Sequence, residues 1–326
     1  MSEVTLVEAV TLALARSMAD DANVVVLGED VGVNGGVFRA TTGLQERFGA
    51  GRVIDTPLAE ALISGLCVGM AVQGLKPVGE IQFMGFMYPC IDHLVNHASR
   101  LRTRTQGRLT CPMVLRMPTG AGIRAPEHHS ESTEAMLAHI PGLRVVIASS
   151  PARAYGLLLA AIRDPDPVVF LEPTRLYRSI KEDVVDDGQA LPLDTAFVLR
   201  AGRDVTIVTW GAAVRESLAA AGVLAAGGIA AEVIDLATLK PYDEEAVLAS
   251  VRKTGRCVIV HEAARTGGFG GEIAACIAER GLMSLLAPIE RVTGYDTVVP
   301  LPSLEQHYMP TIERITAAAR RACTFG

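Results

Sequence analysis

Strand-like and helix-like segments alternate along almost the whole chain, and this rhythm constrains the fold more than any other feature. Short β-branched runs such as residues 23–30 (NVVVLGED) and 204–211 (DVTIVTWG) are typical of buried strands, whereas residues 5–21 carry apolar side chains at helical spacing. Repeated strand–helix–strand units fold into parallel sheets covered by helices. The sequence therefore predicts an α/β protein with mostly parallel sheets.

The alternation breaks once, between residues 174 and 200. The polar stretch SIKEDVVDDGQALPLD (179–194) has no clear period and suits a connection between domains. A chain of 326 residues is long enough for two domains. We expect a first domain over residues 1–180, a linker over 181–200 and a second domain over 201–326.

Charge and cysteine content exclude some classes of protein. The formal net charge of −6 disfavours nucleic acid as the main partner but permits a basic protein domain. Six cysteines occur without a C-x-x-C pair, and several lie in apolar runs, as expected of free thiols in a reducing compartment. The first ten residues, MSEVTLVEAV, lack a basic region followed by an apolar one. We expect a cytoplasmic protein without a signal peptide.

Residues 58–75 (LAEALISGLCVGMAVQGL) form the most apolar segment of the chain. Glu60, Gln73 and three glycines interrupt it, so we interpret it as a buried helix and not as a membrane span. Thr56 and Pro57 match the N-cap and first position of that helix. Small residues at four-residue spacing (Ala61, Gly65, Gly69) would let another backbone approach, either within the chain or at a subunit interface.

Glu60 lies in the first turn of this helix and has two interpretations. It can simply be an acid stabilised by the helix dipole. Alternatively, because no Lys or Arg occurs between residues 56 and 73, its carboxyl group would be buried without a cation. Such a carboxyl can share a proton with a basic ring nitrogen of a ligand.

His128 and His129 follow a predicted strand (112–118) and a glycine-containing loop. Open α/β sheets bind ligands beyond the carboxyl ends of their strands, and the glycines at 120 and 122 let a backbone approach closely. A histidine there can donate or accept a proton near neutral pH. Surface histidines without a chemical role are the alternative.

Three other motifs carry less functional information. His93 and His97, in a predicted helix over 88–105, have the spacing of a metal pair but lack the glutamate of H-E-x-x-H, so surface or interface histidines are expected. TGGFGGE (266–272) matches neither nucleotide-binding fingerprint and predicts a tight turn. No Gly-Asp-Gly motif followed by a distant Asn, the diphosphate motif of thiamine diphosphate enzymes, occurs in the sequence.

An ordered set of segments resembles a known family across essentially the whole chain. These segments are DTPLAEALISG (55–65), GEIQFMGFMYPCIDHLVNHASRLR (79–102), HHSESTEAMLAHIPGLRVV (128–146), DPDPVVFLEPTRLYR (164–178), EVIDLATLKPYD (232–243) and HEAARTGGFGGEI (261–273). Together they resemble the beta subunit of the thiamine-diphosphate-dependent decarboxylating component of 2-oxo acid dehydrogenase complexes. The family includes pyruvate, branched-chain 2-oxo acid and acetoin members.

The resemblance implies a transketolase-like fold and half of an active site. The first domain would bind the aminopyrimidine of thiamine diphosphate, and the second would hold the assembly together. The alpha subunit of an α₂β₂ heterotetramer would supply the diphosphate site with its Mg²⁺, in keeping with the missing motif. A lipoylated acyltransferase would receive the acyl group, and its basic subunit-binding domain would dock on the second domain.

The resemblance also implies roles for individual residues. Glu60 matches the glutamate that bonds the aminopyrimidine ring nitrogen, Leu58 an apolar residue beside that ring, and Phe86 an aromatic position against it. His129 matches the active-site histidine and would act when the acyl unit moves to the lipoyl disulfide. His128 is an extra histidine at a variable position that flanks the site.

Some relatives hold a potassium ion through backbone carbonyls, and Ala161, Asp164 and Asp166 match its neighbourhood. Pro112 and Pro165 depart from that pattern.

Three alternatives to a 2-oxo acid dehydrogenase subunit remain open from the sequence. An acetoin-cleaving subunit would use the same cofactor on another substrate. A self-sufficient homodimeric α/β enzyme would hold its whole ligand within this chain. A structural docking subunit would need neither Glu60 nor His129.

Overall fold

The computed structural model describes residues 2–325 and divides them into two compact units. The first unit contains the chain up to Thr119 together with Met136–Leu193. The second contains Gly120–Ala135 and the chain from Asp194 onward. Two strands, β8 (Lys181–Val184) and β9 (Phe197–Arg200), lie within the range expected to be a linker.

The first unit is built around a parallel sheet, as the alternating sequence predicts. Its neighbouring strands are ordered β6-β7-β5-β4-β2-β3, and every one of these pairs is parallel. The strands are β2 (Val24–Gly28), β3 (Val53–Asp55), β4 (Lys76–Glu80), β5 (Val114–Thr119), β6 (Arg144–Ile147) and β7 (Val168–Pro173). β1 (Ser2–Thr5) instead pairs antiparallel with β8.

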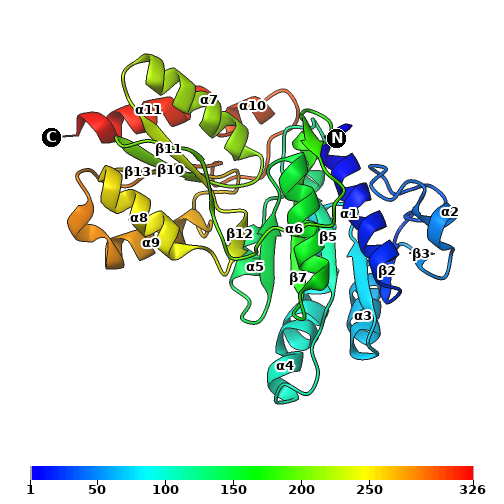
Figure 1. Cartoon of the computed structure of the whole chain (residues 1–326). Helices are drawn as coiled ribbons and strands as arrows, with labels where there is room; N and C mark the ends of the chain where they lie inside the picture. The colour runs from blue at the N-terminus through cyan, green and yellow to red at the C-terminus, as the bar shows by residue number, and fades with distance from the viewer. Residues whose placement is uncertain (1, 326) are drawn as a thin grey trace. The chain divides into compact units, whose positions relative to one another are not determined.

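Helices cover this sheet because their apolar faces match it. α1 (Leu6–Asp20) packs beside α6 (Pro151–Arg163) in Figure 1. Thr5 and Glu8 form a capping box at the start of α1, and Ser150 with Pro151 begins α6 as the sequence predicts. The unit also contains α2 (Leu44–Phe48), α3 (Glu60–Val72) and α4 (Leu101–Arg104). Helix α5 (Glu134–Ala138) begins in the segment Gly120–Ala135 of the second unit and ends in the first unit.

Helix α3 differs from its prediction in two respects. It begins at Glu60 with Ala59 as N-cap, so the expected cap at Thr56 is wrong. The Thr56 amide donates to the Gly28 carbonyl at 2.9 Å, which extends the strand pairing past β3 and delays the helix. Only one face of α3 is buried, through Ile63, Ser64, Cys67 and Ala71. Among the described residues, no helix is both long and apolar enough to cross a membrane.

The predicted regular helix over residues 88–105 is also wrong. The chain there passes through short 3₁₀ turns, a π-helical turn at His93–His97, another 3₁₀ turn and α4. The π-helical turn shifts the hydrogen-bond register, so His93 and His97 do not occupy a regular α-helical face.

The second unit has its own sheet and two helix layers. Its strands are ordered β14-β13-β10-β11-β9, with β9 antiparallel and the other pairs parallel. In Figure 1, α7 and α11 lie on one face of this sheet, and α8 and α9 lie on the other. The elements are β10 (Val205–Thr209), α7 (Ala213–Ala226), β11 (Ala231–Asp235), β12 (Thr238–Lys240), α8 (Glu244–Thr254), β13 (Cys257–Val260), α9 (Gly270–Arg280), β14 (Glu290–Val292), α10 (Glu305–Tyr308) and α11 (Ile312–Thr324). Valine, isoleucine and alanine side chains from the sheet, α7 and α11 form one buried core.

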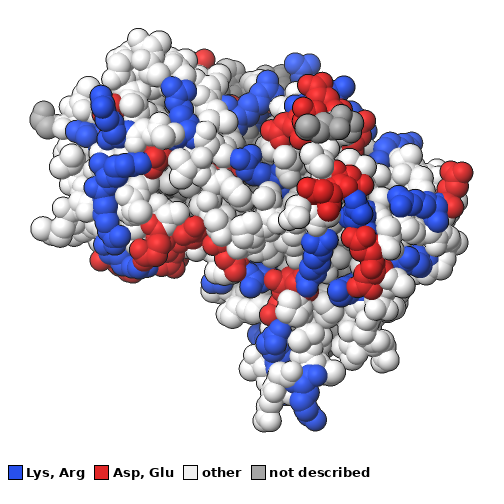
Figure 2. Space-filling model, viewed as in Figure 1, with Lys and Arg blue, Asp and Glu red and all other residues white. Residues whose placement is uncertain are grey.

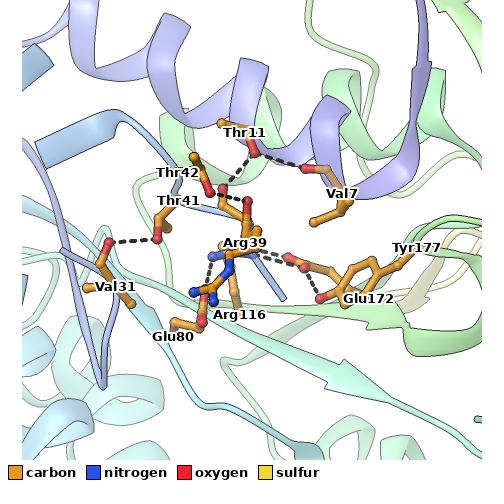
Figure 3. A network of polar contacts seen from close by, with 11 residues as sticks. Val7, Thr11, Val31, Arg39, Thr41, Thr42, Glu80, Arg116, Glu172 and Tyr177 are labelled. Atoms are coloured by element: carbon orange, nitrogen blue, oxygen red, sulfur yellow. Dashed lines mark hydrogen bonds and ion pairs between the residues drawn. The ribbon is translucent and has the colours of Figure 1, made fainter. Parts of the chain in front are cut away.

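A buried polar network crosses the first unit's sheet (Figure 3). Arg116 of β5 is 1% exposed and forms a bidentate pair with Glu172 of β7 at 2.7 and 2.9 Å. Its remaining terminal nitrogen donates to Glu80 of β4 at 2.9 Å, and Tyr177 donates to Glu172 at 2.6 Å. Burial raises the pKa of Glu80 despite the opposing charge of Arg116.

Charged side chains of both signs are interspersed over the face shown in Figure 2. On the described residues of that face, no continuous basic field appears, in keeping with the net charge of −6. Such a surface does not concentrate the positive potential on which binding to nucleic acid depends.

Candidate functional site

Glu60 lies where the carboxyl ends of two parallel strands meet. β2 and β3 pair in register up to Gly28 and Asp55, so the residues that follow each strand emerge at the same edge of the sheet. Glu60 is half-buried at the first position of α3. No salt bridge of the described residues joins its carboxylate to a cation. The position favours an interaction with a ligand group over an internal ion pair.

Glu29 is a second carboxyl at this edge, and the sequence analysis missed it. It directly follows β2 and is buried, and its Oε1 has no hydrogen-bond partner within the described chain. Burial and then the negative charge of Glu60 raise the pKa of Glu29. The stretch GED (28–30) does not form a Gly-Asp-Gly motif and carries no other catalytic signature. Its place after a β-branched strand was the signal that could have found this residue.

The two carboxyls fit a basic nitrogen heterocycle. A buried carboxyl group that has no cation beside it and lies in the field of another negative charge retains its proton more readily than an isolated one. An orphaned buried oxygen on Glu29 leaves hydrogen-bonding capacity unused. A ligand that brings both a basic nitrogen and a donor N–H, as an aminopyrimidine does, would satisfy these groups.

Leu58 and Phe86 lie in the loops near this edge of the first unit. Leu58, between β3 and α3, is 81% exposed, which is unusual for a leucine next to an apolar helix. Phe86 is half-buried in the 3₁₀ turn Met84–Phe86, and its ring meets that of Phe83 edge to face at 5.6 Å. An exposed leucine and a partly exposed aromatic ring suit contact with a planar ligand or a partner subunit.

His128 and His129 belong to the second unit, in the segment Gly120–Ala135. Both lie in the 3₁₀ turn Glu127–His129, which is closed by hydrogen bonds from the His129 amide to Pro126 and from the Ser130 amide to Glu127. His128 is exposed, whereas His129 is half-buried and is followed by the fully buried Ser130. This difference in burial gives His129 the more fixed position of the two.

Small residues of α3 line an open groove of about 580 Å³. Ala61, Gly65 and Gly69 all contribute to it. A side chain at Gly65 would meet His93 of the same unit at 3.1 Å, whereas a Cβ at Gly69 would meet nothing within 4 Å. Packing within the chain therefore accounts for Gly65 but leaves Gly69 uncovered.

Asp92 joins His93 and His97 in a cluster whose ligand atoms lie within 4.8 Å of one another. Asp92 and His97 are exposed, and Asn96 donates to the Asp92 carboxylate at 2.7 Å. The expectation that these histidines do not form a metal site stays a prediction.

The residues matched to the potassium neighbourhood have other roles in the first unit. Asp164 caps the end of α6, and its amide donates to the Ala161 carbonyl at 3.3 Å. Its carboxylate pairs with Arg144 at 3.1 Å, and Asp166 pairs with Arg102 at 2.7 Å. The carboxylates are thus engaged by arginines, which leaves backbone carbonyls as the only candidate ligands there.

Two of the four glycines in residues 266–272 pack against a histidine. A Cβ at Gly268 or Gly270 would lie 2.7 Å from the ring of His261, which is fully buried and stacks on Trp210 at 5.1 Å. Burial lowers the pKa of His261 to about 4, so the ring is neutral at pH 7. Close packing explains Gly268 and Gly270 without a bound phosphate, and Gly267 has a positive φ of 67° that favours glycine.

Comparisons with known proteins agree with this architecture. Residues 2–180 match the transketolase pyrimidine binding domain family, and residues 194–315 match the transketolase C-terminal domain family. A solved split-gene transketolase, an inactive beta4 tetramer, superposes with a TM-score of 0.81 at 24% identity over 99% of each chain, which supports the fold alone.

Curated relatives match over the full length. The pyruvate dehydrogenase E1 component subunit beta of Acholeplasma laidlawii is 49% identical over 98% of both chains. The subunit of the same name in Bacillus subtilis (strain 168) is 47% identical over 100% of both. The resemblance, the expected transketolase-like fold and the two mostly parallel sheets are confirmed. The chain belongs to the family of beta subunits of the thiamine-diphosphate-dependent component of 2-oxo acid dehydrogenase complexes.

Proposed function

We propose that this chain, together with an alpha subunit, oxidatively decarboxylates pyruvate or a related 2-oxo acid and acylates the lipoyl group of a partner acyltransferase. The observation that carries the proposal is the pair Glu29 and Glu60, two carboxyl groups at the carboxyl edge of the first unit's sheet, with an orphaned oxygen on Glu29 and no salt bridge to Glu60 among the described residues. The relatives named as pyruvate dehydrogenase subunits favour pyruvate among the substrates.

In this proposal Glu60 accepts or shares a proton at the ring nitrogen of the aminopyrimidine. Glu29, whose pKa is raised by burial and then by the negative charge of Glu60, would hold its own proton more readily than an isolated carboxyl group. Leu58 and Phe86 contact the ring from the loops. When bound, thiamine diphosphate supplies the electron sink for loss of carbon dioxide. The alpha subunit would hold its diphosphate with Mg²⁺, because this sequence has no diphosphate motif.

His129 would serve the later step, transfer of the acyl group to a lipoyl disulfide. A half-buried imidazole on a closed turn can orient a dithiolane and donate the proton that the departing sulfur needs. His128, exposed beside it, would have a supporting role only. We also propose a cytoplasmic α₂β₂ assembly, with the open groove at Gly69 covered by a subunit. A potassium ion bound by carbonyls near Ala161 stays a prediction.

The first test compares Glu60→Gln with Glu46→Gln, which changes an exposed glutamate of the same unit. Both variants are co-expressed with the alpha subunit. We expect Glu60→Gln to lower the rate of decarboxylation by roughly 10² to 10⁴-fold, the usual contribution of a general acid–base group, while assembly stays intact. Full activity of Glu60→Gln would remove this carboxyl from the mechanism.

The second test compares His129→Ala with its neighbour His128→Ala. Decarboxylation with an artificial electron acceptor and acylation of a lipoyl domain are measured separately. We expect only His129→Ala to lose lipoyl acylation, and to keep decarboxylation and the affinity for thiamine diphosphate. A panel of pyruvate, branched-chain 2-oxo acids and acetoin identifies the substrate; activity on acetoin alone would contradict the proposed reaction.

A further inference from the structure

The segment that carries His129 is fastened at its start by two glutamates from distant parts of the second unit. Glu305, at the first position of α10, is 1% exposed and lies 181 to 183 residues away in sequence. Its Oε1 accepts from the Gly122 amide at 2.8 Å, and its Oε2 accepts from the Arg124 amide at 3.3 Å. Glu262, which follows β13, accepts a short hydrogen bond from the Ala121 amide.

Apolar contacts reinforce this attachment. Ala121, Tyr308 and Met309 form a small buried cluster, so the C-terminal end of α10 and the loop pack on each other. Arg314 of α11 donates to the carbonyls of Tyr308 and Met309, the latter at 2.7 Å, and holds the C-terminal end of α10 in place. Glu305 is therefore presented by a braced element and not by a mobile side chain on the surface.

The backbone between residues 120 and 124 needs such an attachment. Gly120 and Gly122 have φ values of +87° and +98°, and Arg124 has φ of +58°. For a residue with a side chain, the left-handed region costs about 1–2 kcal/mol, so Arg124 is strained. Gly120 also lies so close that a Cβ there would meet Glu262 Oε1 at 2.7 Å. Strain of this kind persists only where surrounding contacts over-determine the conformation.

The far end of the segment is fixed as well. The Gly120 amide donates to the Glu131 carbonyl at 2.9 Å, which closes the loop on itself. Trp210 donates through its indole nitrogen to Glu134 at 3.2 Å, and both side chains are buried. His129 thus lies in a closed loop whose position depends on the attachment of residues 121–124.

We propose that Glu305 is a positioning residue, which holds the strained Gly120–Arg124 backbone and so fixes where His129 meets the lipoyl group. The inference rests on the proposed role of His129 in acyl transfer. Glu305 does not touch substrate; it acts by accepting two backbone amides with its two oxygens. A glutamine in its place offers only one acceptor oxygen, and its amide group would face one of the two N–H groups.

The test uses Glu305→Gln in the assembled alpha–beta protein, with Glu279→Gln as the matched control, since Glu279 is an exposed glutamate of α9 in the same unit. Hydrogen exchange of peptides covering residues 117–135 reports the attachment without reference to activity. We expect faster exchange there in Glu305→Gln only. Glu305→Asp keeps both oxygens and the charge, and should restore part of the protection.

The kinetic arm separates a positioning role from a purely structural one. We expect lipoyl acylation to fall roughly 10 to 100-fold in Glu305→Gln, the effect of misplacing a reacting group by about 1 Å, while decarboxylation with an artificial acceptor changes less than about twofold. Unchanged hydrogen exchange of residues 117–135 in Glu305→Gln would contradict the claim that Glu305 holds this loop. Faster exchange with unchanged acylation, where His129→Ala does impair it, would overturn the positioning role. If His129→Ala itself leaves acylation intact, the proposed function of His129 falls, and the exchange data still decide whether Glu305 holds the loop.

Discussion

Replacing Arg116 by methionine tests the buried network of the first unit. The substitution removes three hydrogen bonds, two to Glu172 and one to Glu80, and leaves both carboxyl groups enclosed between strands. Removing one partner of a buried ion pair typically costs about 3–5 kcal/mol, because an uncompensated charge stays in a low-dielectric environment. We expect a loss of that size in the free energy of unfolding of the first unit.

Arg102→Met is the matched control because it deletes the same functional group from an exposed pair. Arg102 and Asp166 are 45% and 31% exposed in their side chains, and a single hydrogen bond of 2.7 Å joins them. Exposed pairs contribute about 0–1 kcal/mol. The comparison between the two variants therefore contrasts a buried arginine that bridges two carboxylates with an exposed arginine that pairs with one.

The stability loss caused by Arg116→Met should depend on pH, and the direction of that dependence follows from the pKa of Glu80. Without Arg116, the pKa of Glu80 in the folded protein is raised further above its unfolded value of about 4.3. A carboxyl whose folded pKa is raised destabilises the folded state once the pH exceeds the unfolded pKa, and it does so fully above the folded pKa. The deficit of Arg116→Met should therefore shrink as the pH falls toward about 4. Glu80→Gln added to Arg116→Met should recover part of the loss at pH 7.

Urea unfolding followed by circular dichroism measures these differences. The single tryptophan, Trp210, lies in the second unit, so its fluorescence reports that unit separately. The reasoning fails if Arg116→Met costs no more than Arg102→Met at pH 7, or if its deficit grows as the solution is acidified.

Two further predictions follow from the carboxyl pair and from the groove. Glu29→Gln should raise the free energy of unfolding at pH 8, because the pKa of Glu29 is raised in the folded state, and this gain should vanish below about pH 4. Urea unfolding at several pH values measures the gain, and a gain that does not change with pH would contradict the prediction. Gly69→Leu should prevent association with the alpha subunit, measured by light scattering, without altering the thermal stability of the chain, because a Cβ there meets nothing within 4 Å. Gly222→Leu, equally open but on α7, is its control and should assemble normally.

Local sequence predicted the elements whose signals are local. β-branched runs such as 23–30 and 204–211 form strands β2 and β10, and Ser150–Pro151 begins α6. These succeed because strand propensity and capping depend on residues within a few positions. The same reasoning was wrong at Thr56, where a tertiary bond to Gly28 competes with the helix cap.

The sequence by itself determined the alternation of strand and helix, the family and the candidates Glu60 and His129, because periodicity and motif order are written along the chain. Only the tertiary structure decided which distant groups meet. It placed Glu29 and Glu60 at the same edge of the first unit's sheet through the parallel pairing of β2 with β3, and Arg116 between Glu80 and Glu172. It also brought Glu305 to the amides of Gly122 and Arg124. A single glutamate has no periodic signature, and its neighbours are set by strand order and loop closure, which no local pattern records.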